Sequence, residues 1–276
     1  MRPPRTTRRT SRADLALRGP VLLYVVLLVL LPLATLVKVG LGRGLGAALA
    51  AITSPVALNA LVLTLWTSLV VAIVGGVMGT IVAWVLVRYR FPGRGALSAL
   101  VDLPLAIPTL VAGMALVALL GPQTAIGAAL GGAGIKIAFA APAIVLALAF
   151  VTLPFPVRAV EPVLMELDPA EEEAASTLGA SSPMTFWRVI LPPLLPAIGS
   201  GAAQAFARAL AEFGSIVVVS GNIPNRTLTA PVYIFGEIES GNPEAATAVA
   251  VVLLAVALLS TIGARNLERL GRESRA

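Results

Sequence analysis

Long apolar windows with no charged residue dominate the pattern of hydrophobic and polar positions along the chain. They occupy residues 19–37, 44–87, 103–135, 137–157, 189–207 and 245–262. A helix needs about 20 largely apolar residues to cross the hydrocarbon core of a membrane, and each window is long enough for one span. The pattern therefore predicts an all-α membrane protein with six transmembrane helices.

Two of these windows are too long for one helix and too short for two helices with a loop. We place the second span at residues 58–87 and leave 44–55 as a connection. The third window divides into a helix near 103–120 and a glycine-rich loop that runs through Gly134. Pro104 and Pro108 are expected to kink that third helix, because proline removes a helical hydrogen bond.

The fifth span is expected at about residues 196–220, although it contains two charged residues, Arg208 and Glu212. A charge in the middle of a membrane costs about 2.5–3.5 kcal/mol on insertion scales, so such residues face protein or water. At positions i and i+4 they share a helix face and can pair. Two interpretations stay open: an ion pair that fixes helix packing, or a functional pair that lines a path or gate through the membrane.

Composition supports a membrane protein and excludes several kinds of enzyme. Hydrophobic residues make up 58% of the 276 residues and charged residues only 12%, against about 45–50% and about 25% in soluble domains. The sequence has no Cys and no His, so it lacks thiolate and imidazole metal ligands and His-dependent nucleophilic sites. A membrane-embedded hydrolase would need convergent polar groups, and Asp102 has no second Asp within a span.

The positive charges predict the orientation of the spans. The net charge is +6, and most of the 20 Lys and Arg residues lie on the side that carries both termini. The positive-inside rule then places both termini in the cytoplasm and accounts for the basic isoelectric point near 10.7 without nucleic-acid binding. The exceptions are Lys38, Arg43, Lys136 and Arg226 on the opposite side and Arg208 within a span.

This topology divides the chain into three parts. Residues 1–18 form an Arg-rich cytoplasmic tail, 19–264 form one six-span membrane domain, and 265–276 form a cytoplasmic C-terminal tail. The first apolar run exceeds the 7–15 residues of a signal-peptide core, so we expect it to be retained as a membrane anchor.

The longest hydrophilic stretch, residues 158–195, begins with a well-specified helix start. Asp168 is expected to be the N-cap and Pro169 the first helical residue, where its missing N–H costs nothing. Gly179 then supplies the left-handed position that ends the helix. Ser182-Pro183 repeats the start signal for a second helix, which we expect to stop at Pro192-Pro193.

Within this stretch, a spaced motif carries a family resemblance. Its positions are Glu173, Ala174, Ala175, Gly179, Val189, Leu191 and Pro192. They match E-A-A, three residues, G, nine residues, I, one residue and L-P, with Val189 in the isoleucine position. The segment resembles the EAA loop of ABC-importer permeases. That resemblance implies a type I importer core and a coupling helix that docks into a groove on a cytoplasmic ATPase subunit.

The resemblance implies that a separate subunit hydrolyses ATP with Mg²⁺ and that this chain binds no cofactor. A phosphate-binding P-loop requires Gly-Lys, but Lys38 and Lys136 follow Val37 and Ile135. We therefore expect a transport subunit rather than an enzyme. A channel acting alone is a weaker alternative, because it would not explain a capped cytoplasmic helix pair with this motif.

Further segments resemble the sulfate-transport permeases of the CysT (CysU) type. They are residues 88–94, 102–104, 108–109, 111–113, 208–215, 220–224 and 245–248. This resemblance implies import of sulfate and possibly thiosulfate, a second similar permease subunit, two ATPase subunits and an extracytoplasmic sulfate-binding protein. Molybdate or tungstate permeases, which share the Arg-Phe-Pro-Gly and Glu-Phe-Gly elements, are the alternative.

Two smaller patterns complete the expectations. Gly75 and Gly79, with Gly76 between them, have the G-x-x-x-G spacing that is typical of close helix packing. The loop from Gly221 to Glu244 would face the binding protein.

Overall fold

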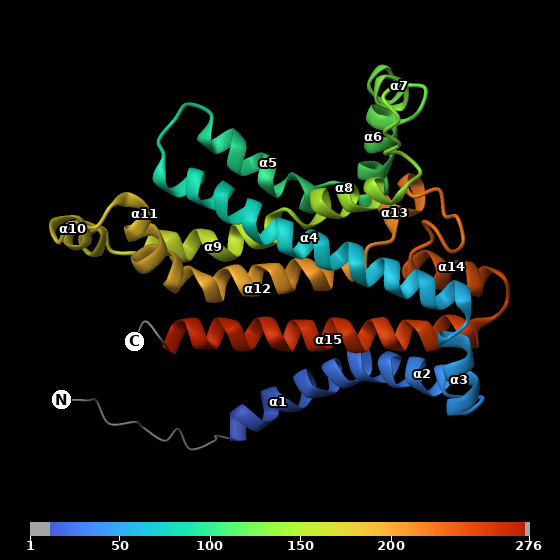
Figure 1. Cartoon of the computed structure of the whole chain (residues 1–276). Helices are drawn as coiled ribbons and strands as arrows, with labels where there is room; N and C mark the ends of the chain where they lie inside the picture. The colour runs from blue at the N-terminus through green and yellow to red at the C-terminus, as the bar shows by residue number, and fades with distance from the viewer. Residues whose placement is uncertain (1–11, 274–276) are drawn as a thin grey trace.

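The computed structural model describes residues 12–273, and its regular elements within that range are all helical (Figure 1). The Arg-rich residues 1–11 and the last three residues lie outside the described part. In chain order the helices and two π-helical turns are α1 (Arg12–Val25), η1 (Val26–Leu30), α2 (Leu31–Gly40), α3 (Leu45–Ile52), α4 (Pro55–Arg88), α5 (Arg94–Ala106), α6 (Thr109–Leu120), α7 (Ala125–Gly132), α8 (Ala141–Thr152), α9 (Pro154–Glu166), α10 (Pro169–Thr177), α11 (Ser182–Thr185), η2 (Phe186–Ile190), α12 (Leu191–Leu210), α13 (Gly214–Val219), α14 (Ala230–Glu239) and α15 (Pro243–Glu273).

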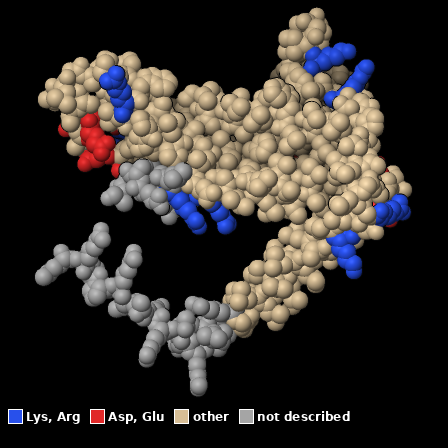
Figure 2. Space-filling view, turned by 60° about the horizontal axis from the view of Figure 1, so that its bottom comes forward, with Lys and Arg blue, Asp and Glu red and all other residues tan. Residues whose placement is uncertain are grey.

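The described part holds up to six candidate membrane spans, in agreement with the predicted number. Four helices are long and apolar enough to cross a membrane: Gly19–Gly40, Pro55–Arg88, Ser182–Leu210 and Pro243–Leu267. Two bent pairs, α5 with α6 and α8 with α9, bring the number to six if each pair is one span. Figure 2 shows a broad uncharged band on one face, with charged side chains on either side of it.

The third span is a sharply broken pair, so the prediction of one helix over 103–120 is wrong. Helix α5 ends at Ala106, α6 begins at Thr109, and their axes differ by 113°. The break falls at Ile107, which is extended with ψ 129°, because the ring of Pro108 disfavours helical geometry in the residue before it. Pro104 lies inside α5 without ending it, so the expected kink forms at Pro108.

The fourth span bends by 41° where Leu153 meets Pro154, and α9 extends to Glu166. The first part of the hydrophilic stretch 158–195 therefore belongs to helix α9. A Cβ added to Gly79 would lie 2.7 Å from the Pro156 side chain. A Cβ added to Gly201 would lie 2.7 Å from the Cα of Pro156. The Gly79 contact confirms the close packing expected for the glycines of α4, and Gly201 of α12 approaches α9 equally closely.

The fifth span starts and ends earlier than its sequence predicts. It is continuous from Ser182 to Leu210 and passes through Pro192-Pro193, where we expected a helix end. The two prolines lie in the first turn of α12, directly after η2, and the wider π-helical turn accommodates their missing donors. Its N-cap is Ser181 rather than Ser182.

Several connections are more structured than their composition suggests. The segment assigned to a connection at 44–55 contains α3, the glycine-rich loop through Gly134 contains α7, and the loop from Gly221 to Glu244 contains α14. Helix α15 continues from the last span into the residues assigned to the C-terminal tail.

The long helices lie side by side along one direction. Helices α4, α9 and α12 pack on one another, and α15 packs on both α12 and α2 (Figure 1). Helices α10 and α11 project at one end of this bundle, near the C-terminus, and α3 and α14 lie at the opposite end. We call the end with α10 and α11 the coupling end, after the predicted coupling helix, and the end with α3 and α14 the far end.

Candidate functional site

The coupling segment, residues 168–192, starts and turns as its sequence predicts. The Asp168 side chain accepts a hydrogen bond of 2.9 Å from the backbone N–H of Ala170, and Pro169 is the first residue of α10. Gly179 adopts a left-handed conformation with φ +84° and ends the helix. A short rigid helix therefore stands at the coupling end.

One side of the coupling segment is fixed to α4. Arg88, at the end of α4, forms an ion pair with Glu172 of α10. The Arg88 guanidinium also lies 5.1 Å from the centre of the Trp84 ring, and this ring packs edge-on against Phe186 with centroids 5.7 Å apart. Charge and aromatic contacts together attach both halves of the coupling segment to one long membrane helix.

The other side of the coupling segment is an exposed apolar surface. Leu178 is 88% exposed, Trp187 is 65% exposed and Met184 is 45% exposed. Of the motif residues, Glu173, Ala174, Gly179 and Pro192 are exposed, and Ala175, Val189 and Leu191 are half-buried. Apolar side chains on a charged, water-facing end are typical of a docking surface.

Arg208 and Glu212 do pair, but not on one continuous helix. Helix α12 ends at Leu210, and Glu212 lies just beyond it with 1% of its side chain exposed. Its Oε2 lies 2.8 Å from Nη2 of Arg208. Its Oε1 accepts hydrogen bonds from the backbone N–H of Ser215 at 2.9 Å and from the Ser215 hydroxyl at 3.0 Å. Glu212 therefore joins the end of α12 to the start of α13.

The break after α12 touches the break before α6. A Cβ on Gly214 would lie 2.3 Å from Oγ1 of Thr109, and one on Gly113 would lie 2.6 Å from the carbonyl oxygen of Ser215. The backbones of α6 and α13 can approach this closely because neither glycine carries a side chain that would keep the helices apart. We call this contact between α6 and α13 the helix-break junction.

Sequence reasoning missed a polar cluster around Arg158 of α9. Its Nε donates to Oδ1 of Asp102 at 2.8 Å, its Nη2 donates to the Ser98 hydroxyl at 2.9 Å, and its Nη1 donates to Glu161. Arg158 thereby links α9, which leads to the coupling segment, with α5, which leads to the helix-break junction. Arg158 and Asp102 are 56 residues apart in sequence, so no local pattern could have paired them.

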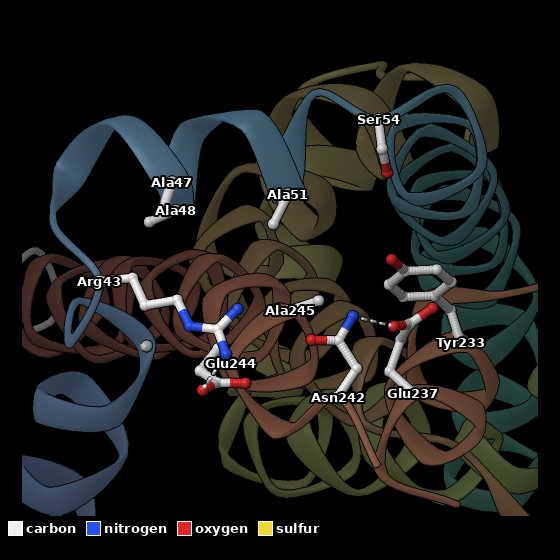
Figure 3. Close-up of a pocket in the computed structure, with 11 residues that line it drawn as sticks. Arg43, Ala47, Ala48, Ala51, Ser54, Tyr233, Glu237, Asn242, Glu244 and Ala245 are labelled. Atoms are coloured by element: carbon white, nitrogen blue, oxygen red, sulfur yellow. Dashed lines mark hydrogen bonds and ion pairs between the residues drawn. The ribbon is translucent and has the colours of Figure 1, made fainter. Parts of the chain in front are cut away.

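The far end carries a hollow of about 330 Å³ among α3, α14 and the start of α15 (Figure 3). Arg43 pairs with Glu244 at 3.0 Å across its mouth, and Asn242 donates to Glu237 at 2.7 Å. Burial raises the pKa of the Tyr233 phenol above its usual value near 10. The polar groups in the hollow mostly satisfy one another, which indicates that they fix the far-end helices.

No set of metal ligands is present in the part of the chain that the structure describes. Residues 12–273 contain no group of three or more Asp, Glu, His or Cys side chains that could hold a metal ion.

The sequence and the fold both match known transport proteins. The family described as "Binding-protein-dependent transport system inner membrane component" matches residues 75–272. A probable sulfate transport system permease protein of Chlorokybus atmophyticus is 46% identical over 218 residues, which are 79% of this chain and 76% of that one. The sulfate transport system permease protein CysT of Escherichia coli (strain K12) is 42% identical over 92% of both chains.

Solved structures support the fold. A bacterial alginate ABC transporter, crystallised with a periplasmic protein that holds an alginate pentasaccharide, aligns with a TM-score of 0.71 at 20% identity and covers 92% of this chain and 93% of that one. The inward-facing MetNI methionine ABC transporter aligns with a TM-score of 0.56 at 21% identity and covers 79% and 99%. At these identities the likeness concerns architecture alone.

Proposed function

This chain belongs to the family of binding-protein-dependent transport system inner membrane components, and we propose that it is the transmembrane permease subunit of an ATP-driven sulfate importer. It is a transport subunit rather than an enzyme. One observation carries the substrate: 42% identity to a sulfate permease along 92% of both chains. The curated relatives at this level of identity carry sulfate in their names, so molybdate is not favoured. Thiosulfate, which resembles sulfate in shape and charge, belongs to the same proposal.

The partners follow from the kind of importer. We propose a pore built with a second, similar permease subunit, two cytoplasmic ATPase subunits that bind ATP and Mg²⁺, and an extracytoplasmic sulfate-binding protein. This chain binds neither cofactor itself and forms half of the pore within the lipid bilayer. No nucleic acid takes part.

The coupling segment is where the ATPase subunit docks. Its exposed side offers Leu178, Met184 and Trp187, and its attached side holds α4 through Arg88 and Glu172. A push on the exposed side therefore moves α4 as well as the loop, because the ion pair and the ring contacts oppose a separate motion. Glu173, Ala174 and Ala175 contribute the charge and the small surface of the docking site.

The proposed translocation path or gate is the Arg208–Glu212 pair, which lies beside the helix-break junction. The Arg208 side chain is 33% exposed and its partner Glu212 is buried, so part of the Arg208 side chain stays accessible. A cation held by a carboxylate attracts an oxyanion weakly, which suits a passing substrate better than a tight site would. The same ion pair also fixes the packing of the end of α12, which was the other interpretation of its sequence spacing.

Orientation is part of the same proposal. The coupling segment and the C-terminus lie at one end of the bundle (Figure 1), and an ATPase acts from the cytoplasm. The excess of Arg on that side supports cytoplasmic termini in a multi-pass protein of the bacterial cell membrane.

Complementation tests the function. Cells that lack this chain receive the wild type, Gly179→Asp or Gly134→Asp, and ATP-dependent uptake of labelled sulfate is measured with molybdate as competitor. Both glycines have positive φ, and a Cβ on either would meet open space, so both substitutions add the same backbone strain and charge. We expect Gly179→Asp to abolish uptake and Gly134→Asp to retain it.

Two outcomes would contradict the proposal. If sulfate uptake does not depend on this chain while molybdate uptake does, the substrate is wrong. If both glycine variants accumulate normally and transport equally well, the coupling role of the segment is wrong.

A further inference from the structure

A second hollow, of about 220 Å³, lies on the flank of α4 at the far end of the bundle. Its polar rim consists of Asn59, Asn225 and Arg226, and its lower wall includes Val62 and Trp66. The Asn59 amide donates to Oδ1 of Asn225 at 3.2 Å, which leaves the Asn225 amide nitrogen turned away from this contact. The Asn59 amide also donates to the carbonyl oxygen of Pro55 at 2.7 Å. The rim therefore presents the Asn225 amide as a donor and Arg226 as a cation.

The charge of this rim is not balanced by protein. No acidic residue lines the hollow, and no ion pair of Arg226 is found within residues 12–273. Asn225 adopts a left-handed conformation with φ +61°, which asparagine tolerates in turns. An arginine beside an amide donor is suited to a phosphate or sulfate group.

Below the rim, an exposed apolar stripe descends along α4. Its members are Leu58, Val62, Trp66, Leu69, Ile73, Val77 and Ile81. At about 1.5 Å per residue the stripe is about 35 Å long, slightly more than the hydrocarbon core of about 30 Å. Since the stripe is slightly longer than this core, its ends, one of which lies beside Asn59, are suited to the headgroup regions of the bilayer.

The cationic rim and the apolar stripe together complement a ligand that has an anionic head and an apolar tail. We propose that this hollow binds an anionic phospholipid, with the phosphodiester at Arg226 and Asn225 and an acyl chain along Val62 and Trp66. A free oxyanion would use only the rim and would make no contact with the apolar stripe. The proposal does not depend on which solute the importer carries.

Photo-crosslinking tests the site. The complete importer is reconstituted into phosphatidylcholine vesicles that contain phosphatidylglycerol with a photoreactive acyl chain, or phosphatidylcholine with the same chain in its place. Labelled peptides are then located by mass spectrometry. We expect labelling near Val62 and Trp66 with a preference for phosphatidylglycerol, and Arg226→Gln should reduce that preference about fivefold, the effect of about 1 kcal/mol for one cation at a membrane surface.

The control is Arg43→Gln, a second arginine of the far end that is paired with Glu244 in the other hollow. It should leave the preference unchanged. Equal labelling by both lipids, or displacement of the lipid by free sulfate, would overturn the proposal. An absence of labelling on this stripe would also overturn it, since the face would then be covered by another subunit.

Discussion

The coupling segment and the helix-break junction lie in the same chain but are built in opposite ways. At the coupling segment, half-buried charges and aromatic rings attach a helix whose other side stays exposed, with Leu178 at 88%. At the junction, two glycines allow helix ends to approach closely, beside the buried carboxylate of Glu212, which is 1% exposed. The first arrangement suits a surface that another protein moves, and the second suits two helix ends that must move together.

The largest loss of stability is expected when the buried carboxylate beside the junction is removed. Glu212→Leu removes the partner of Arg208 and the acceptor at the start of α13, so we expect a loss of about 3 kcal/mol in stability. Thermal denaturation in detergent and the amount of protein in the membrane measure it. A double variant with Arg208→Met should regain stability but not sulfate uptake; recovery of both would show that the pair only serves packing.

A smaller effect is expected from the glycine contact. Gly113→Ala places a methyl group 2.6 Å from a backbone oxygen, so the helices must separate at a cost of about 1–3 kcal/mol. Gly95→Ala in α5 is the matched control, because a Cβ there meets nothing within 4 Å and alanine favours a helix. The same denaturation assay compares them, and equal stability of both variants would contradict the close contact.

The smallest effect on stability is expected at the coupling segment. Glu172→Gln removes an ion pair whose side chains are 22% and 28% exposed, and water screening limits its contribution to about 1 kcal/mol or less. Stability should barely change, whereas sulfate uptake per ATP hydrolysed should fall, because α4 no longer follows the coupling helix. Glu171→Gln, at an exposed neighbouring position, should change neither quantity. Unchanged coupling in Glu172→Gln would refute a role for this attachment.

Much of the architecture was predictable because its signals are local. The apolar windows predicted the number of spans, and Asp168, Pro169 and Gly179 predicted the bounds of α10 to within a few residues. The positions of the helix breaks were harder to predict from the sequence. A helix was expected to stop at Pro192-Pro193 and to continue across 103–120, but a π-helical turn accommodates the first pair and Pro108 breaks the second helix.

The candidate site was only partly predictable from its residues. Arg208 and Glu212 were identified as a pair from their spacing, yet the role of Glu212 at the start of α13 depends on where α12 ends. Glu173 was singled out by its motif, but its neighbour Glu172 holds the ion pair with Arg88, 84 residues away. Helical phase decides which of two adjacent carboxylates faces the protein, and that phase is set by packing.

The sequence by itself determined the membrane class, the number of spans, the coupling motif and the family, because each depends on hydropathy or spacing along the chain. Only the tertiary structure decided that two helix breaks meet, that Arg158 links α9 to α5, and that a cationic rim stands above an apolar stripe. Those contacts join residues far apart in sequence, and their geometry depends on how close the glycines and prolines allow whole helices to approach.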